Sequence, residues 1–259
     1  MNSMAYIIAV ANQKGGVGKT TTAVNLAAYL AAKGRFVLFV DLDPQGNATS
    51  SLGVDYRQIE KGLYEALIGA CSVRETVRPT VVEGLKIIPA TSALAGAAVE
   101  LVDMERREFR LANVLLEVRN DYDYVIIDCP PSLGLLTLNG LVAADRVLIP
   151  VQAEYFALEG LSQLHETVGA VRESLRPGLE IMGTVITMFD PRNRLAIDVL
   201  AEIKANFPSR VFASVIPRNV RLAEAPSHGQ PISHYDPWSK GAKAYESLAL
   251  EILEIDEKT

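Results

Sequence analysis

Short apolar runs, most of them rich in β-branched residues, recur along the whole chain. They predict strands at residues 6–11, 36–40, 85–89, 124–128, 146–151, 181–187 and 211–216. Hydrophobicity that is nearly continuous rather than alternating is typical of strands buried on both faces. Helix-like stretches separate these runs and predict helices at residues 20–33, 111–119, 158–175, 197–207 and 242–255.

The alternation of strands and helices predicts the fold class. It favours α/β: a doubly wound, mostly parallel sheet with helices on both faces, in a single domain over residues 1–259. Right-handed crossovers bring the carboxyl ends of the parallel strands to one edge, where ligands bind. We therefore look for chemistry in the segments that directly follow the predicted strands.

A glycine-rich segment, Asn-Gln-Lys-Gly-Gly-Val-Gly-Lys-Thr at residues 12–20, joins the first strand to the first helix. Glycines let the backbone turn tightly with its N–H groups facing inward, and these donors and the helix N-terminus form a phosphate site. Lys19 supplies a charge to the β- and γ-phosphates, and the Thr20 hydroxyl is suited to ligate Mg²⁺. The residues expected to bind the nucleotide here are Gln13, Lys14, Gly15, Gly16, Val17, Gly18, Lys19, Thr20 and Thr21.

One position departs from the general phosphate-loop pattern, which has glycine where this chain has Gln13. A second lysine, Lys14, precedes the double glycine. It is either a solvated surface charge or a group that contacts a phosphate across a subunit interface, as an arginine finger does.

Carboxylates follow two of the predicted strands. Asp128 closes an apolar strand, the Walker B arrangement in which an aspartate holds Mg²⁺ directly or through water. Asp41 and Asp43 follow the 36–40 strand, and the turn-forming Pro44 and Gly46 come next. This segment is interpreted as a switch loop, with two loop-capping carboxylates as the alternative.

Charge is distributed unevenly along the chain. The net charge is −6, yet residues 172–221 hold eight Lys/Arg and five Asp/Glu. Two loops after late strands carry arginines, which converge if those strands are parallel neighbours; the four candidates for DNA contact are Arg192, Arg194, Arg218 and Arg221. Such a patch binds phosphates without sequence preference. The alternative is solvated arginines paired with nearby carboxylates.

The motifs together carry a family resemblance. The string KGGVGKT resembles the deviant Walker A motif of the ParA/MinD group of P-loop ATPases, and the chain is similar to short, chromosomal-type (Soj-like) ParA partition ATPases from about residue 7 to about residue 249. Supporting strings are DLDPQGNAT (41–49), DYVIIDCPPSLGLLT (123–137), VQAEYFALEGL (151–161) and IPRNVRLAEAPSHGQPI (216–232).

The resemblance implies roles for individual residues. Lys14 is the signature lysine that reaches the partner's nucleotide in a nucleotide-sandwich dimer, and it acts in catalysis with Lys19 and Asp43. Asp43 orients the attacking water. The magnesium shell is implied to consist of Thr20, Asp41 and Asp128, and the residues around adenine are Met188, Pro217 and Asn219. A structural turn role remains an equal alternative for Asn219.

The resemblance also implies partners. These are a second copy of the chain, ATP and Mg²⁺, non-specific DNA bound by the ATP dimer (with Arg192 and Arg221 as the strongest contacts), and a ParB-like centromere-binding protein that accelerates a weak hydrolysis. The expected location is the cytoplasm, on the nucleoid. About six residues precede the first strand, too few for a helix-turn-helix module, so operator-specific repression is not expected.

Two other functions remain open. One is a membrane-cycling ATPase of the MinD type, which the acidic end of the 242–255 helix argues against because a membrane helix would be basic and apolar. The other is an ATP-dependent switch that regulates replication initiation or transcription. No apolar run reaches the roughly 18 residues of a membrane span, and no membrane partner is expected. The chain's one tryptophan, Trp238, is expected to pack a turn onto the core.

Overall fold

The computed structural model describes residues 4–207 and 210–257 and is built on one eight-stranded sheet. The strand order is β3-β4-β2-β5-β1-β6-β7-β8, and every pairing is parallel except that of β3 with β4. The strands are β1 (Tyr6–Val10), β2 (Val37–Asp41), β3 (Arg78–Pro79), β4 (Leu85–Ile88), β5 (Tyr124–Asp128), β6 (Arg146–Gln152), β7 (Glu180–Phe189) and β8 (Val211–Pro217).

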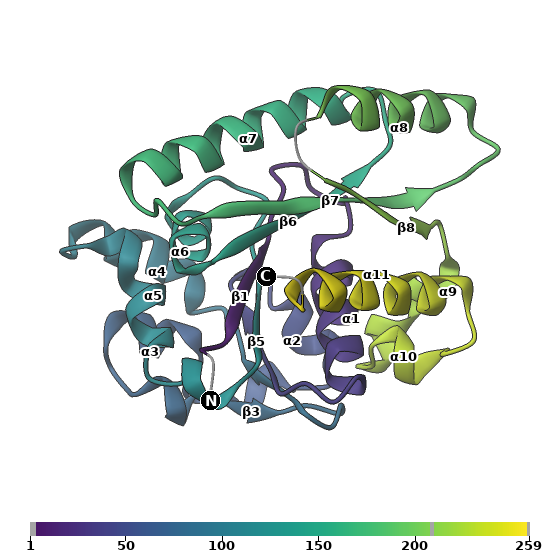
Figure 1. Cartoon of the computed structure of the whole chain (residues 1–259). Coiled ribbons are helices and arrows are strands. Elements are labelled where there is room, and N and C mark those ends of the chain that lie inside the picture. The colour runs from purple at the N-terminus through teal and green to yellow at the C-terminus, as the bar shows by residue number, and fades with distance from the viewer. Residues whose placement is uncertain (1–3, 208–209, 258–259) are drawn as a thin grey trace.

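Helices cover both faces of this sheet (Figure 1). Their bounds are α1 (Lys19–Ala32), α2 (Asn47–Ser51), α3 (Leu63–Ile68), α4 (Leu94–Glu100), α5 (Arg110–Leu115), α6 (Leu135–Ala143), α7 (Ala157–Ser174), α8 (Arg194–Asn206), α9 (Val220–Glu224), α10 (Ile232–Tyr235) and α11 (Lys240–Asp256). The predicted doubly wound, mostly parallel α/β fold is confirmed.

Alternate residues of each central strand enter two separate cores. Ile8 of β1 lies in the core under α1 and α11, whereas the neighbouring Ile7 lies in the core under α3 to α8. Both side chains are fully or almost fully buried. Because both faces are covered, the central strands consist of nearly continuous apolar runs, the pattern seen in the sequence.

All seven predicted strands are present, and β3 is an addition. It is two residues long, contains Pro79 and pairs antiparallel with β4 at one edge of the sheet. At the opposite edge, Glu251 of α11 lies against β8. Its carboxylate accepts hydrogen bonds from the backbone N–H groups of Ala213 (2.9 Å) and Ser214 (2.6 Å) and from the Ser214 hydroxyl.

Candidate nucleotide site

The glycine-rich loop leaves β1 and turns directly into α1. Gly16 (φ 75°) and Gly18 (φ 86°) both adopt the left-handed conformation, which glycine reaches without steric cost. Gly18 is the N-cap of α1, so the free N–H groups of the helix open toward the loop. The Thr187 hydroxyl of β7 donates to the Val17 carbonyl at 2.8 Å and fixes the loop to the sheet.

Lys19, the first residue of α1, is buried at 7% exposure. Its Nζ donates to the Lys14 carbonyl oxygen at 3.1 Å, which closes the loop on itself. Burial lowers the pKa of this ammonium, and the nearby Asp128 carboxylate opposes the shift. An anionic ligand in the loop would stabilise the charged form of Lys19.

The strand register brings two aspartates together beside this loop. Asp41 at the end of β2 pairs with Asp128 at the end of β5, and Asp128 pairs on its other side with Val10 of β1. Both carboxylates are completely buried. The arrangement follows from parallel strands that end at the same edge, as the sequence predicts.

The buried carboxylate of Asp128 lacks the hydrogen bonds that a buried polar group usually makes. Neither of its oxygens has a hydrogen-bond partner among the described residues. The Thr20 side chain lies beside it without a hydrogen bond of normal geometry. Burial, reinforced by the charge of Asp41, raises the pKa of Asp128 well above its usual range.

These groups fit a divalent cation. A bound Mg²⁺ would stabilise the ionised form of Asp128, and the Thr20 hydroxyl and the oxygens of a phosphate are the hard ligands that this ion prefers. The described residues contain no group of three or more His, Cys, Asp or Glu side chains that could enclose a metal. That finding suits Mg²⁺, which is usually held by one or two protein ligands together with substrate phosphates and water.

Asp41 is tied to the segment that follows it. Its Oδ2 accepts hydrogen bonds from the backbone N–H (2.8 Å) and the hydroxyl (2.7 Å) of Thr49 in α2, and its Oδ1 accepts from the Asp43 N–H at 3.3 Å. Burial nevertheless raises the pKa of Asp41 to about 6. Asp41 therefore couples the end of β2 to the conformation of residues 43–49.

Asp43 begins an exposed turn at the same edge. Its carbonyl accepts from the Gly46 N–H at 2.9 Å, and its Oδ1 accepts from the Gln45 N–H at 3.0 Å. The second carboxylate oxygen makes no hydrogen bond within the described residues. The capping role considered from the sequence is present, and it leaves one oxygen available to a water molecule or ligand.

Lys14 points to a carboxylate of its own chain. Its Nζ lies 2.7 Å from the Oε2 of Glu154, which follows β6, and the two side chains are 41% and 46% exposed. A half-exposed ion pair of this kind is worth about 0–1 kcal/mol. The pair is therefore too weak to hold Lys14 against a competing phosphate.

The residues expected around adenine line a common cavity of about 190 Å³. Met188, Pro217 and Asn219 border it together with Gly18 and Tyr245. Met188 has φ 51°, uncommon for a residue other than glycine and found where a site constrains the backbone. The Asn219 Oδ1 caps α9 by accepting from the Arg221 N–H at 2.8 Å, so Asn219 has the turn role considered from the sequence. Its amide NH2 group makes no hydrogen bond among the described residues.

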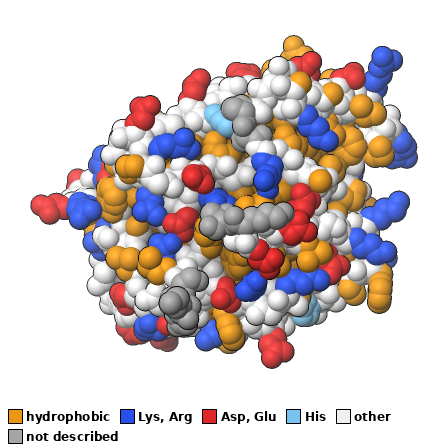
Figure 2. All heavy atoms as spheres, viewed as in Figure 1, with side chains coloured by type: hydrophobic (Ala, Val, Ile, Leu, Met, Phe, Trp, Pro, Cys, Tyr) orange, Lys and Arg blue, Asp and Glu red, His pale blue; other side chains and the backbone are white. Residues whose placement is uncertain are grey.

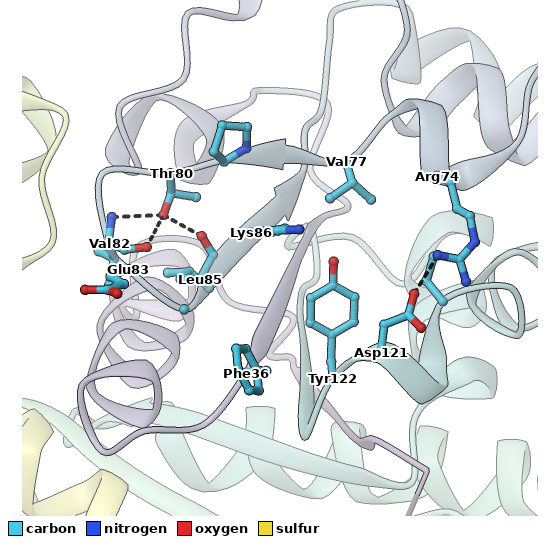
Figure 3. A pocket seen from close by; sticks show the side chains of 13 residues that line it. Phe36, Arg74, Val77, Thr80, Val82, Glu83, Leu85, Lys86, Asp121 and Tyr122 are labelled. Carbon is cyan, nitrogen blue, oxygen red and sulfur yellow. Dashed lines mark hydrogen bonds and ion pairs between the residues drawn. The ribbon is translucent and has the colours of Figure 1, made fainter. Parts of the chain in front are cut away.

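A larger cavity, about 670 Å³, lies at the amino ends of the strands, away from the glycine-rich loop (Figure 3). It is bordered by the segments that lead into β2, β4 and β5, and Phe36 and Tyr122 point into it. Arg74 is paired there with Asp121 at 2.6 Å, and the Thr80 hydroxyl bonds to backbone atoms. With its arginine paired and no glycine-rich loop, this cavity lacks the features of a triphosphate site.

The four candidate arginines emerge at one edge, because β7 and β8 are parallel neighbours. All four are exposed. Arg192 is paired with Asp190 at 2.7 Å, and Arg221 with Glu224 at 2.9 Å. Arg194 and Arg218 make no ion pair within the described residues. The two strongest sequence candidates are thus the two with intramolecular partners.

Comparison with known proteins places the chain in a family. A model of an AAA domain matches residues 5–181. The sporulation initiation inhibitor protein Soj of Bacillus subtilis is 56% identical, covering 96% of this chain and 98% of that protein. The chromosome-partitioning ATPase Soj of Treponema pallidum is 51% identical over 98% and 99%. The chain belongs to the ParA/Soj family of chromosome-partitioning ATPases.

Solved structures support this ParA/Soj assignment at the level of the fold. A Mycobacterium smegmatis protein named cobyrinic acid a,c-diamide synthase, with bound ADP and magnesium, has a TM-score of 0.87. It is 39% identical, covering 98% of this chain and 96% of that chain. The family assignment confirms the resemblance that the sequence motifs indicated.

Several contacts of this site were not singled out from the sequence. Glu154, the partner of Lys14, lies 140 residues away in the chain, and Thr49 holds Asp41 from the following helix. Both lie within strings that carried the resemblance, but nothing in their local pattern indicated a side-chain partner.

Among the described residues, no helix is long and apolar enough to cross a membrane.

Proposed function

We propose that this chain is a DNA-segregation ATPase whose loop, residues 13–21, binds ATP with Mg²⁺. The buried, unpartnered carboxylate of Asp128 beside the Gly-Lys-Thr loop carries this proposal. Burial disfavours the charged forms of both Lys19 and Asp128, and their mutual attraction only partly offsets this. A triphosphate with its magnesium ion would stabilise both charged forms. Thr20 and Asp128 would hold the ion directly or through water, and Asp41 would support them from the neighbouring strand.

ATP joins two copies of the chain face to face. Lys14 leaves Glu154 and reaches the phosphates of the partner's nucleotide, an exchange that the weakness of the half-exposed pair permits. An aromatic pair follows Glu154 directly: Tyr155 is 74% exposed and Phe156 is 63% exposed. Neighbouring exposed apolar side chains at a loop edge are typical of a surface that another molecule covers.

Hydrolysis is slow and acts as a timer. Asp43 orients the attacking water, while Lys14 and Lys19 stabilise the phosphoryl oxygens, because positioning and charge carry most of phosphoryl transfer. Mg²⁺ held by Thr20 and Asp128 would offset the negative charge of the phosphates. Met188, Pro217 and Asn219 surround the base. Loss of the γ-phosphate releases the segment from Asp43 to Thr49 and with it the dimer.

The closed dimer binds DNA without sequence preference through the arginine loops at residues 190–194 and 217–221. Arg194 and Arg218 enter this surface without an intramolecular ion pair, whereas Arg192 and Arg221 exchange their carboxylate partners for DNA phosphates. The protein thereby resides on the nucleoid in the cytoplasm. A ParB-like centromere-binding protein stimulates hydrolysis and releases the dimer.

A membrane-cycling role is disfavoured by the last helix. Residues Tyr245, Leu248 and Ile252 of α11 are buried in the core, and Glu251 is bonded to β8. A helix used in this way turns its main apolar face to the core of the protein and not to lipid. A synthase role is disfavoured because the neighbour with that name is 39% identical, below the partition ATPases at 51% and 56%.

The test is DNA co-sedimentation of the purified chain with Mg-ATP, with Mg-ADP and without nucleotide. We expect retention on duplex DNA with ATP alone and its loss in the double variant Arg192→Glu, Arg221→Glu, which still binds ATP. Equal retention in all three nucleotide states would refute the switch, and full retention of the double variant would move the DNA surface elsewhere.

A further inference from the structure

The sequence-based prediction that Trp238 packs a turn onto the core is wrong. Trp238 is 82% exposed, and it is the one tryptophan of the chain. Tryptophan is highly buried on average, and an exposed indole is a favoured anchor at binding surfaces. The side chain borders neither the cavity around the base nor the one between α1 and α2. Its exposure therefore requires a different explanation.

The backbone presents this side chain on a rigid turn. The Ser239 N–H donates to the Asp236 carbonyl at 3.2 Å, with Pro237 and Trp238 as the central residues of the turn. The Ser239 hydroxyl then caps α11 by accepting from the Ala242 N–H at 3.1 Å. The Arg221 Nε lies 3.5 Å from the Asp236 carboxylate, which connects the turn to the arginine loop before α9. The indole therefore projects from a hydrogen-bonded turn that lies next to that loop.

The surroundings of the turn are basic although the chain is acidic. The segments 190–194, 217–224 and 236–243 together hold six Lys/Arg and three Asp/Glu, against a net charge of −6 for the whole chain. Lys240 and Lys243 add to the arginines from the side of α11. In Figure 2, blue side chains project along the right-hand edge, where Figure 1 places the end of β7, α9 and the start of α11.

We propose that Trp238 is an aromatic contact of the DNA surface and packs against the sugar face of duplex DNA, between phosphates held by the flanking arginines and lysines. This rests on the DNA binding proposed above. The positive surroundings favour a polyanion, and sugars are the same at every base pair, so the contact suits binding without sequence preference. An aromatic ring adds a contact that salt does not screen.

The single tryptophan makes the inference directly measurable. With Mg-ATP and a mixed-sequence duplex, we expect the fluorescence of Trp238 to be protected from acrylamide, a neutral quencher that DNA does not repel. Protection that appears with ATP alone and grows with protein concentration would mean that a second copy covers Trp238, and would overturn the inference. Unchanged quenching in a complex shown to contain DNA would also overturn it.

Variants separate the aromatic contact from phosphate contacts. Trp238→Ala is expected to weaken DNA binding about tenfold, because the indole buries apolar area against the sugars, and Trp238→Phe to restore most of it. The slope of log affinity against log salt should stay as in the wild type, whereas Arg218→Ala should make it shallower by about one. Phe36→Ala is the matched control, because Phe36 is also exposed, at 64%, but it directly precedes β2, at the amino ends of the strands and away from the arginine loops.

Each outcome assigns the failure to one level. If the wild-type chain does not bind duplex DNA with Mg-ATP, the proposed function fails. If it binds and Trp238→Ala binds equally well, the DNA surface stands and the role of Trp238 is refuted. Thermal unfolding of both Trp238 variants confirms that the turn still supports α11.

Discussion

The buried carboxylate of Asp41 gives a quantitative test of the site without any ligand. Its folded pKa is about 6 against an ordinary 3.8, because burial outweighs the hydrogen bonds from Thr49 and Asp43. The folded chain therefore holds this proton more tightly than the unfolded chain does. The contribution of Asp41 to stability is fully present below about pH 4 and is lost as the pH rises through 6.

The two pKa values set the size of the effect. A pKa of about 6 in place of 3.8 costs the folded state about 3 kcal/mol at pH 7 and about 2 kcal/mol at pH 5. Asparagine cannot ionise, so Asp41→Asn removes this dependence. The wild type should thus lose about 1 kcal/mol relative to the variant between pH 5 and pH 7. Removing the Asp41 charge also lessens the rise in the pKa of Asp128, which acts in the same direction. The stated difference is therefore a lower bound.

The assay is urea unfolding of metal-free protein at both pH values, in EDTA and without nucleotide. The quantity of interest is how the difference in unfolding free energy between wild type and Asp41→Asn changes with pH. Burying the asparagine amide costs the variant the same free energy at pH 5 and at pH 7, so this cost cancels. Asp55→Asn is the control: Asp55 is exposed and caps a short turn, which asparagine also does. A stability difference for Asp41→Asn that is equal at pH 5 and pH 7, or that moves the other way, would refute the reasoning.

Three further substitutions test the loop and the cycle. Lys14→Ala should abolish ATP-dependent dimerisation, measured by light scattering, while folding is unaffected because the Glu154 pair is worth at most about 1 kcal/mol; a dimer of normal strength would exclude the role across the interface. Asp43→Ala should keep ATP binding but lose phosphate release, leaving a trapped dimer in gel filtration, and unchanged turnover would remove Asp43 from the mechanism. Gly18→Ala should lower stability by about 1–2 kcal/mol and weaken ATP binding, since φ is 86° there. Gly169→Ala within α7, with open space around its Cα, should instead be neutral or stabilising.

The sheet and the phosphate loop could be predicted because local signals determine them. A strand buried on both faces must be apolar throughout, and a loop that turns into a helix around phosphate must carry glycine at positions such as Gly18. The position of Asp128 beside the loop could be predicted for the same reason, since a carboxylate that ends a parallel apolar strand lies at the edge where the loop begins. The family assignment rests on these same segments.

Contacts between distant segments were not predictable. Lys14 and Glu154 meet only because β1 and β6 are neighbours in the sheet, and strand order is not written in either segment. Trp238 was assigned to the core because tryptophan is usually buried. The turn from Asp236 to Ser239 lies outside both hydrophobic layers, so composition alone gave the wrong environment for its side chain.

The two ends of the sheet limit how copies of this chain can associate. Glu251 occupies outward N–H groups of β8, and β3 offers only two residues, one of them a proline without an N–H. Both borders are therefore poor templates for a further strand, which disfavours growth into open-ended sheets. In the proposed cycle, two copies would therefore meet through loops and side chains, contacts that can separate once the bond between two phosphates is broken.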